Sequence, residues 1–500
     1  MEINPFIYGR SLTPTEMVGR QQEMQFVLGR LVKRQSTAVV APPHSGKTTF
    51  LQALADPATR QAVAGDRFAN DIFSFVDAQA MQGITNQAAF WQLALQPLAA
   101  QIIPAAATEL PAKRIDVEIL NKLQAGFIIA EIRELSFSLN VDYENLPGKR
   151  KADKALELIT FLKRRERLDE LLTLCRQLRP KTQWPDIIPP IVSSQSNLVG
   201  VYQTAVNNQF GNWVLEQLFR KLWQNKQRFI LLIDEFDDFL ANKTLHTAEF
   251  YGGLRSLASR SPGLALIIAT RRELETLNQL TQEINPHGSP YFNVFTEYHL
   301  GALSDRAMTQ LLSLGQARFD THDTDFVKTL SGQHPFLAQT AAAAVWDAHQ
   351  QNLQGSTRYQ MAGKTFFDNS NGHFADTWRI LTTGQRRAVT AVALHQIFTL
   401  TNGQSPQPHP NFSTYKPDLD KLARSGFVAE TDYGWMLCQQ GFVWWLLKNL
   451  RATVQTKADF TVWLQQQGLD GHVSPKEKEW MGVMAETAVK HSFTYKPPAV

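Results

Sequence analysis

The sequence predicts an α/β core with a five-stranded, mostly parallel sheet, into which an all-helical bundle is inserted. Short apolar runs occur at residues 38–40, 72–77, 228–235, 264–270 and 291–300, and amphipathic segments alternate with them. Such runs are typical of parallel strands buried on both faces, and the alternation predicts a doubly wound sheet. More than a hundred residues separate the second run from the third. A structureless loop of that length is implausible, so we expect a folded insert there.

Composition limits the class of protein. The 500 residues are 43% hydrophobic, which is enough for two to four domains. No apolar run approaches the roughly 20 residues of a membrane span. The N-terminus lacks the basic and apolar regions of a signal peptide, so we expect a cytoplasmic protein that does not use a membrane. Cys175 and Cys438 have no metal-ligand spacing and fit a reducing compartment. A net charge of +4 does not by itself indicate nucleic acid.

The run at 38–40 leads into a loop that ends in Gly46-Lys47-Thr48, and an amphipathic segment follows. This is the order of a phosphate-binding loop (P-loop), in which backbone N–H groups and a helix N-terminus hold phosphates. Lys47 would reach the β- and γ-phosphates of ATP or ADP, and the Thr48 hydroxyl would help to hold Mg²⁺. Ala41 replaces the usual first glycine, which requires that its φ is not positive. The predicted nucleotide-binding residues are Ala41, Pro42, Pro43, His44, Ser45, Gly46, Lys47, Thr48 and Thr49.

Two acids, Asp234 and Glu235, end the run at 228–235. Ligands of parallel sheets bind just outside the carboxyl ends of the strands, so we expect both side chains beside the P-loop. Asp234 would act on Mg²⁺ through a water molecule, and Glu235 would polarise the attacking water. The predicted catalytic residues are therefore Lys47, Asp234 and Glu235. The predicted metal-binding residues are Thr48 and Asp234.

The segments before and after this core resemble parts of AAA+ and STAND ATPases. The turn Val18-Gly19-Arg20 precedes a helical pattern, as does the segment that covers adenine in those families. The resemblance makes Gly19 and Arg20 nucleotide-binding candidates. An ordinary capped surface helix is the alternative.

Two later segments resemble phosphate-contacting parts of the same families. The run at 264–270 ends in Thr270-Arg271, where these families place a polar or cationic group that faces the γ-phosphate. Arg271 is the candidate sensor, Thr270 is the alternate, and a basic loop is the plainer interpretation. The segment from Gly332 to Pro335 resembles the Gly-x-Pro element of STAND ATPases. That resemblance implies that His334 and Pro335 contact phosphate from a small helical domain.

Helical periodicity fills residues 115–184, after a single long helix predicted over residues 85–103. The apolar stripes, interrupted by a loop at 142–148, suffice for a small bundle of four or more helices. The first stripes contain Leu120, Leu123, Phe127, Ile128, Ile132, Leu135 and Leu139. The string from Leu135 to Leu171 resembles the effector-associated, death-like domains of bacterial defence proteins. The resemblance implies an effector partner that carries a matching death-like domain.

Charged residues in this bundle are grouped by sign. The basic ones are Lys149, Arg150, Lys151, Lys163, Arg164 and Arg165, and the acidic ones are Glu131, Glu134, Asp142, Glu144, Asp169 and Glu170. Opposite patches on one small bundle can pair head to tail. An ordinary solvated surface is the alternative interpretation.

Residues 375–450 resemble a winged helix, with a helix that begins at Pro417 and is closed by Gly426, followed by a hairpin that turns at Asp432-Tyr433-Gly434. The helix offers Lys416, Lys421 and Arg424, balanced by Asp418 and Asp420. A helix that reads DNA is usually more basic. We therefore favour packing of this module on the nucleotide-binding domain over DNA binding, and no repeat array follows it.

The predicted domains are a P-loop nucleotide-binding domain (1–110 and 190–300), an inserted death-like bundle (111–189), a helical lid (301–365), a winged helix (366–450) and a helical extension (451–500). The resemblance implies a STAND-type ATPase switch in bacterial antiviral defence, with slow hydrolysis and a homo-oligomer in the ATP state. One alternative is an AAA+ ATPase that handles DNA, in which Arg255 or Arg260 would act in trans. A scaffold that does not hydrolyse its nucleotide is the other. The sequence identifies neither the trigger nor the effector.

Overall fold

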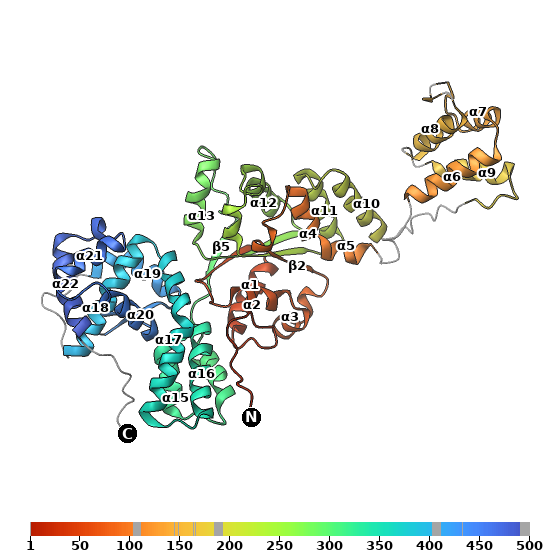
Figure 1. The fold of residues 1–500 in the computed structure, drawn as a ribbon. Helices are drawn as coiled ribbons and strands as arrows, with labels where there is room; N and C mark the ends of the chain where they lie inside the picture. Colours follow the sequence, from red (N-terminus) through yellow and green to blue (C-terminus); the bar gives the residue numbers. More distant parts are fainter. Residues whose placement is uncertain are drawn as a thin grey trace. The chain divides into compact units, whose positions relative to one another are not determined.

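The computed structural model describes residues 2–103, 112–144, 146–148, 150–163, 165, 167–184, 194–402, 412–432 and 434–490. These residues form two compact units (Figure 1). The first unit combines Met1–Ala94 with Phe210–Val500, and the second is Leu95–Gln209. Lys149, Arg164 and Tyr433, which the sequence analysis singled out, lie outside the described residues. Among the described helices, none is both long and apolar enough to cross a membrane.

A five-stranded parallel sheet forms the centre of the first unit, as predicted. Its strands are β1 (Ser36–Val40), β2 (Ile72–Asp77), β3 (Phe229–Asp234), β4 (Leu264–Thr270) and β5 (Phe295–His299). Their order across the sheet is β2-β3-β4-β1-β5, and every neighbouring pair is parallel. All residues of β1, β3 and β4 are buried, which explains why these strands read as continuous apolar runs.

Strand β5 is shorter than the predicted run at 291–300. Residues 291–294 form a turn instead, because the amide of Phe292 donates to the side-chain oxygen of Asn278 (3.1 Å) and the amide of Phe295 donates to the carbonyl of Phe292 (3.1 Å). These amides are therefore not available to a neighbouring strand.

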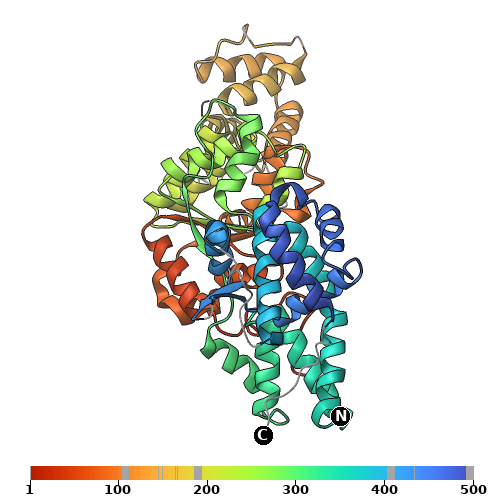
Figure 2. The ribbon, with the colours of Figure 1, turned by 90° about the vertical axis from the view of Figure 1, so that its left-hand side faces the viewer.

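Helices cover both faces of the sheet (Figures 1 and 2). On one face lie α1 (Gln21–Val32), α2 (Lys47–Ala55) and α3 (Pro57–Ala64), and α1 and α2 share an apolar core with β1, β3 and β4. The other face carries α4 (Gln87–Ala94), α11 (Asn212–Gln224) and α12 (Ala248–Arg260). Helix α13 (Leu274–Thr281) follows β4. This arrangement leaves the carboxyl ends of the strands for a ligand.

The single helix predicted over residues 85–103 is wrong. The chain forms α4 and then a separate helix, α5 (Gln96–Ile102). Pro97 lies in the first turn of α5, and its ring removes a backbone donor that a continuous helix would need. The carbonyl of Ala94 instead accepts the hydroxyl of Ser74 at 2.6 Å. Helix α5 belongs to the second unit.

The second unit contains the predicted bundle. Helices α6 (Ala112–Gly126), α7 (Ile129–Ser138), α8 (Lys151–Lys163) and α9 (Leu168–Leu178) share one apolar core, and α8 packs against the other three. The unit also includes α5 and α10 (Ser194–Asn207), which pack against each other, so it extends beyond the predicted insert at 111–189. Ile128 is not part of an apolar stripe, because 64% of its surface is exposed at the start of α7.

The C-terminal helical region begins with α14 (Asp305–Leu312), which Ser304 caps, since its hydroxyl accepts the amide of Ala307. The elements that follow are α15 (Thr321–Ser331), α16 (Pro335–Gln350), α17 (Gly355–Ile380), α18 (Thr383–Asn402), α19 (Lys416–Arg424), β6 (Val428–Thr431), β7 (Gly434–Leu437), α20 (Gln440–Arg451), α21 (Asp459–Gln466) and α22 (Pro475–Lys490). Their buried side chains form one continuous core.

The C-terminal helical region does not divide where the sequence analysis placed a lid and a winged helix. Helix α17 has 26 residues and runs through the predicted boundary between 365 and 366. Helix α19 and the antiparallel pair β6–β7 follow one another as the winged-helix resemblance implies. The winged helix itself stays a prediction.

Candidate nucleotide-binding site

The loop between β1 and α2 has the backbone geometry that a P-loop needs. Gly46, which precedes α2, has φ 85° and ψ 23°, a left-handed conformation that favours glycine. His44 has φ 58°. Ala41 is not among the residues with positive φ, and its amide donates to the carbonyl of Thr270 at 3.1 Å. Alanine therefore fits where P-loops usually begin with glycine.

Lys47 is held inside the loop. Its side chain is buried, and Nζ donates to the carbonyls of Ala41 (3.2 Å) and Pro42 (3.1 Å). Burial lowers the pKa of Lys47, and the nearby carboxyl groups of Glu235 and Asp234 act against this effect. Neutral carbonyls only partly satisfy a buried ammonium group. A phosphate at this loop would be a stronger partner.

Strand β3 ends by placing two acids beside the P-loop, as predicted. Asp234 is 2% exposed, and its Oδ1 accepts the amide of Glu235 at 3.0 Å. Burial raises the pKa of Asp234, whereas a hydrogen bond from Thr48 lowers it. The contact between Thr48 and Asp234 joins the two residues predicted to bind Mg²⁺. Oxygen ligands of this kind suit that ion.

Glu235 has an unusual backbone for its residue type, with φ 46° and ψ 43°. Strained positions of this kind occur at functional sites. Its buried Oε2 atom has no hydrogen bond, although it lies 3.3 Å from Nε of Arg271. Burial raises the pKa of Glu235, while Lys47 and Arg271 lower it. A group with these properties can accept a proton from a water molecule.

Arg271, the predicted sensor, lines the cavity and forms ion pairs with acidic side chains. Its Nε lies 2.8 Å from Oδ2 of Asp237, its amide donates to Oδ1 of the same residue, and its guanidinium also pairs with Asp238. Thr270, the alternate sensor, is fully buried, and its hydroxyl bonds with the backbone of Arg272. Arg271 is therefore the better placed of the two.

The start of α16 contacts the P-loop. Nε2 of His334 lies 3.4 Å from the hydroxyl of Ser45, and both side chains are buried. Two more histidines lie nearby: the ring of His373 is 4.9 Å from that of His334 and 5.4 Å from that of His44. Burial lowers the pKa of all three, to about 3 for His373. His373 comes from the middle of α17, where no local pattern marks it.

A cavity of about 640 Å³ adjoins these groups, which is within the usual range for a ligand pocket. Residues 43–49, Glu235 and Arg271 form one side of it. The other contributors include Phe336, Gln339, Asp376, Arg379 and Ile380. Pro335 also lines the cavity. The C-terminal helical region and the P-loop therefore line the same cavity.

An N-terminal segment, residues 7–12, also lines this cavity, and the sequence analysis missed it. The amide of Leu12 donates to the hydroxyl of Thr49 (3.2 Å), and the amide of Ile7 donates to the side chain of Gln339 (3.0 Å). The segment thus connects α2 with α16. Long-range contacts such as these bring it to the site, so no local motif could have revealed it.

Gly19 and Arg20 contact the part of the chain that follows β5. Gly19 has φ 74°, and a Cβ there would lie 2.4 Å from the Cβ of Ala307. Arg20 lines the cavity, but its guanidinium donates to the carbonyl of Gly301 at 2.8 Å. The side chain of Arg20 therefore fastens the segment that follows β5 rather than pointing to a ligand.

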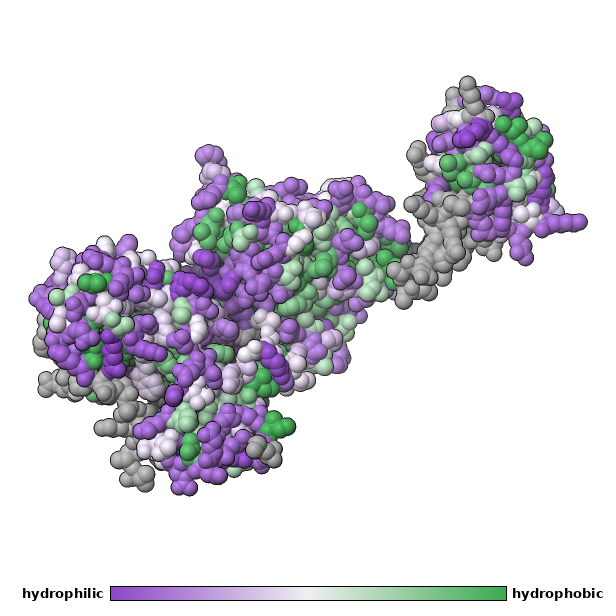
Figure 3. Space-filling model, viewed as in Figure 1, coloured by the Kyte–Doolittle hydropathy of each residue, from purple (hydrophilic) through white to green (hydrophobic). Residues whose placement is uncertain are grey.

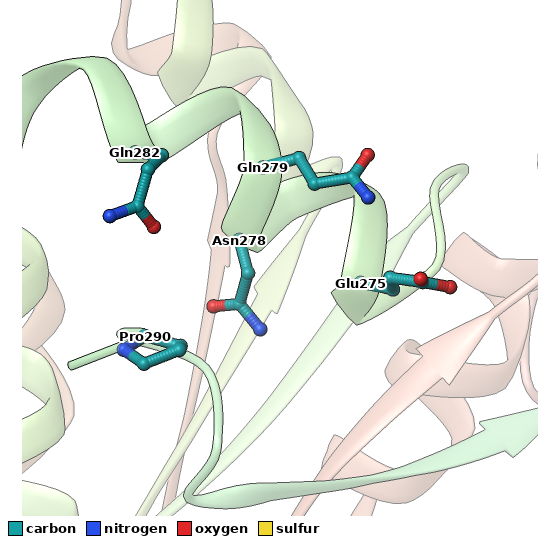
Figure 4. A pocket seen from close by; sticks show the side chains of 5 residues that line it. All are labelled: Glu275, Asn278, Gln279, Gln282 and Pro290. Carbon is teal, nitrogen blue, oxygen red and sulfur yellow. The ribbon is translucent and has the colours of Figure 1, made fainter. Parts of the chain in front are cut away.

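A second hollow of about 640 Å³ lies beside α13 (Figure 4). It is lined by Glu275, Asn278, Gln279, Gln282 and Pro290. This lining offers a carboxylate and amides but no cation for a phosphate. The nucleotide site is therefore assigned to the cavity at the P-loop.

Two family models match the chain. Residues 213–397 match Novel STAND NTPase 2, and residues 119–180 match Effector-associated domain 7. The chain is a STAND-type P-loop ATPase with an effector-associated domain. The first match covers β3 to α17, which includes Glu235, Arg271, His334 and His373. The P-loop of this STAND-type ATPase precedes the matched range.

Several solved structures are similar to this chain at low sequence identity. A Walker-type ATPase of Pyrococcus abyssi is 13% identical, with 88% of this chain and 99% of that chain covered and a TM-score of 0.39. The Aeropyrum pernix ORC2 protein, in complexes with ADPNP and ADP, is 11% identical, with 87% and 95% covered and a TM-score of 0.38. The Cdc6 protein of Pyrobaculum aerophilum is 13% identical, with 88% and 97% covered and a TM-score of 0.32. No curated protein matches the chain.

Proposed function

We propose that this STAND-type ATPase is a signalling switch that binds Mg-ATP, hydrolyses it slowly and recruits an effector through its effector-associated domain, in bacterial antiviral defence. In the proposed cycle, ADP favours a closed state and ATP an open one that forms a homo-oligomer. The effector would carry a matching death-like domain.

The observation that carries the proposal is the composition of the cavity at the P-loop. The P-loop, Glu235 directly after β3 and side chains of α16 and α17 all line it. A nucleotide in this cavity would therefore contact the C-terminal helical region directly. A change in its γ-phosphate could alter how that region packs, because a ligand shifts an equilibrium by binding two states differently.

The residues at the strand ends have defined roles in the proposed hydrolysis. Lys47 would neutralise charge on the β- and γ-phosphates, and Glu235 would accept a proton from the attacking water. Thr48 and Asp234, already in contact, would hold Mg²⁺, which supplies charge stabilisation and orientation of the phosphates.

Calorimetric titration with ATP and ADP tests the site. Lys47→Ala removes the cation aimed at the phosphates, so affinity should fall about tenfold or more. The exposed Lys33 supplies a matched control, and Lys33→Ala should bind as the wild type does. Unchanged affinity in Lys47→Ala would refute the assignment of the site.

The switch is tested with a variant that binds ATP but does not cleave it. Glu235→Gln keeps the size of the side chain but cannot accept the proton, so ATP should bind and persist. This variant should co-purify in ATP, and not in ADP, with a protein encoded beside it that carries a matching domain. Wild-type turnover by Glu235→Gln would contradict the role of Glu235.

The AAA+ alternative requires an arginine that acts on the nucleotide of a neighbouring copy. This arginine would be Arg255 or Arg260, both on α12, and neither lines the cavity. Arg255 donates to the carbonyl of Ser289. Duplex DNA that stimulates turnover would favour the AAA+ alternative, and bound ADP without turnover would favour a scaffold.

A further inference from the structure

Many charged side chains of the effector-associated domain, including several that suggested electrostatic pairing of bundles, already have partners inside the domain. Nζ of Lys151 donates to the carbonyl of Phe127 (3.2 Å), and Nζ of Lys154 donates to those of Tyr143 (2.9 Å) and Leu146 (2.6 Å). Ion pairs join Arg150 with Asp153, Arg167 with Glu170, Arg179 with Glu131 and Arg133 with Glu144. The guanidinium of Arg165 lies over the ring of Phe161 at 3.7 Å. These groups would have to leave their partners in order to bind another bundle.

Helix α7 exposes large apolar side chains instead. Phe137 is 86% exposed, Ile128 is 64% exposed and Ile129 is 45% exposed. Ile129, Arg133 and Phe137 follow at intervals of four residues, which places them along one side of the helix. Apolar side chains gather over this part of the bundle (Figure 3). Exposed apolar residues that cluster in this way mark interaction sites.

The charges on this side of α7 are balanced. Arg133 lies between the two apolar positions and pairs with Glu144 at 2.5 Å, and their side chains are 63% and 73% exposed. A surface that presents one cation and one anion beside apolar residues is complementary to itself. In a two-fold contact this ion pair can exchange partners, so that Arg133 of each copy leaves its own Glu144 and faces Glu144 of the other copy.

We propose that the effector-associated domains of two copies of this chain contact each other through the α7 side, formed by Ile128, Ile129, Arg133 and Phe137 together with Glu144. This inference rests on the proposed function, in which such domains bind like with like. Three apolar side chains per copy fall short of the roughly 800 Å² per partner of a stable interface. The contact is therefore weak by itself and forms when assembly of the ATPase in ATP raises the local concentration of the domains.

The test uses the full chain with Glu235→Gln, in ATP, and measures self-association by sedimentation. Adding Phe137→Asp should weaken self-association about tenfold or more, since it places a charge in an apolar contact. Leu178 supplies a matched control, because it is 52% exposed at the end of α9 in the same domain. Leu178→Asp should leave association within about twofold of the parent.

Charge exchange tests the two-fold arrangement. Arg133→Glu should weaken association, because each copy then presents two acids to the other. The double variant Arg133→Glu with Glu144→Arg should restore it. An apolar contact should also keep most of its strength when salt rises from about 0.1 M to 0.5 M, whereas pairing of exposed charges should weaken strongly.

The outcomes distinguish the inference from the proposed function. If Phe137→Asp associates as its parent does, the α7 inference is wrong. A parent that stays monomeric in ATP would contradict both the α7 inference and the homo-oligomer of the proposed ATP state. Loss of effector co-purification in Phe137→Asp with unchanged self-association would also overturn it, because the occupant would then be the effector. The proposed function fails separately, through normal ATP binding by Lys47→Ala or normal turnover by Glu235→Gln.

Discussion

Nε2 of His334, at the start of α16, lies 3.4 Å from the hydroxyl of Ser45 in the P-loop. His334 is the cap of α16, whose other end belongs to the core of the C-terminal helical region. The contact therefore joins the loop that would hold phosphates to the region that would respond to them. Nδ1 of His334 is buried without a hydrogen bond, so the contact with Ser45 is the polar interaction that this ring makes.

His334→Ala should loosen the connection between the P-loop and α16. We expect ADP to dissociate several-fold to about tenfold faster, because a buried contact of a polar group contributes about 1 kcal/mol. Stopped-flow displacement of a fluorescent ADP analogue measures this rate. The exposed His287 supplies a control, and His287→Ala should release ADP at the wild-type rate. An unchanged rate in His334→Ala would mean that α16 does not restrain the nucleotide.

The three histidines near the P-loop should make the fold sensitive to acid. Burial lowers the pKa of His44, His334 and His373, so each takes up its proton at a lower pH in the folded chain than in the unfolded chain. In the unfolded chain each takes up a proton below about pH 6.5. The unfolded chain then binds more protons than the folded chain, so the free energy of unfolding falls as the pH falls. The loss approaches about 1.4 kcal/mol per pH unit for each histidine.

Thermal unfolding between pH 8 and pH 5 measures this dependence. His373→Gln should show a shallower fall in Tm than the wild type, since one titrating group is removed. The comparison between variants is needed because the pKa values of Asp234 and Glu235 are raised in the folded chain. These two groups therefore increase the free energy of unfolding as the pH falls, which opposes the effect of the histidines. A His373→Gln slope equal to that of the wild type would show that His373 does not titrate on unfolding.

The sheet and the P-loop were predictable because their signals are local. Strands β1, β3 and β4 are wholly buried, and such strands need continuous apolar runs. The acids Asp234 and Glu235 follow one of these runs directly. The break between α4 and α5 also had a local signal in Pro97, which the apolar periodicity on both sides outweighed.

The rest of the site could not be predicted, because tertiary contacts assemble it. His373 reaches the P-loop through the packing of α17, and residues 7–12 reach it through bonds to Thr49 and Gln339. Neither segment carries a motif. The charged residues of the effector-associated domain suggested binding patches for a similar reason, since the sequence does not show that Lys151 donates to the carbonyls of Gln124 and Phe127 in its own domain.

Arg271 should set the pH at which Glu235 can act as a base. Burial raises the pKa of Glu235, and the positive charge of Arg271 lowers it. Arg271→Ala removes that charge, so the pKa of Glu235 should rise further and the acid limb of the pH profile of kcat/KM should move to higher pH. Arg272 lies 4.0 Å from Asp237 and supplies a control, since Arg272→Ala should leave the limb in place. An acid limb that does not move in Arg271→Ala would place its titrating group elsewhere.

We expect Lys421 to contribute to the packing of α19 against α13 and not to DNA binding. Its Nζ lies 3.1 Å from Glu273 and 3.3 Å from Glu275, so α19 is tied to the start of α13. Lys421→Glu should therefore change the ADP release rate severalfold. Lys416, on the same helix, is 59% exposed and pairs with Asp420, and Lys416→Glu should leave the rate unchanged. If α19 instead bound DNA, both changes would weaken duplex binding and lower its salt dependence.

Removing the effector-associated domain should separate signalling from nucleotide binding. The core of α6 to α9 is distinct from the core that supports the P-loop. Helices α5 and α10, which flank the bundle along the chain, pack against each other, and neighbouring ends allow a domain to be excised. Replacing residues 112–186 with a short Gly/Ser linker should keep the ATP affinity, measured by calorimetry, within about threefold of the wild type.

The same variant should no longer recruit an effector, whereas Phe137→Asp in the full chain should remove only the association between copies. Loss of ATP binding on excision would place the bundle within the ATPase core, and effector recruitment by the excised protein would place the recruiting surface outside it.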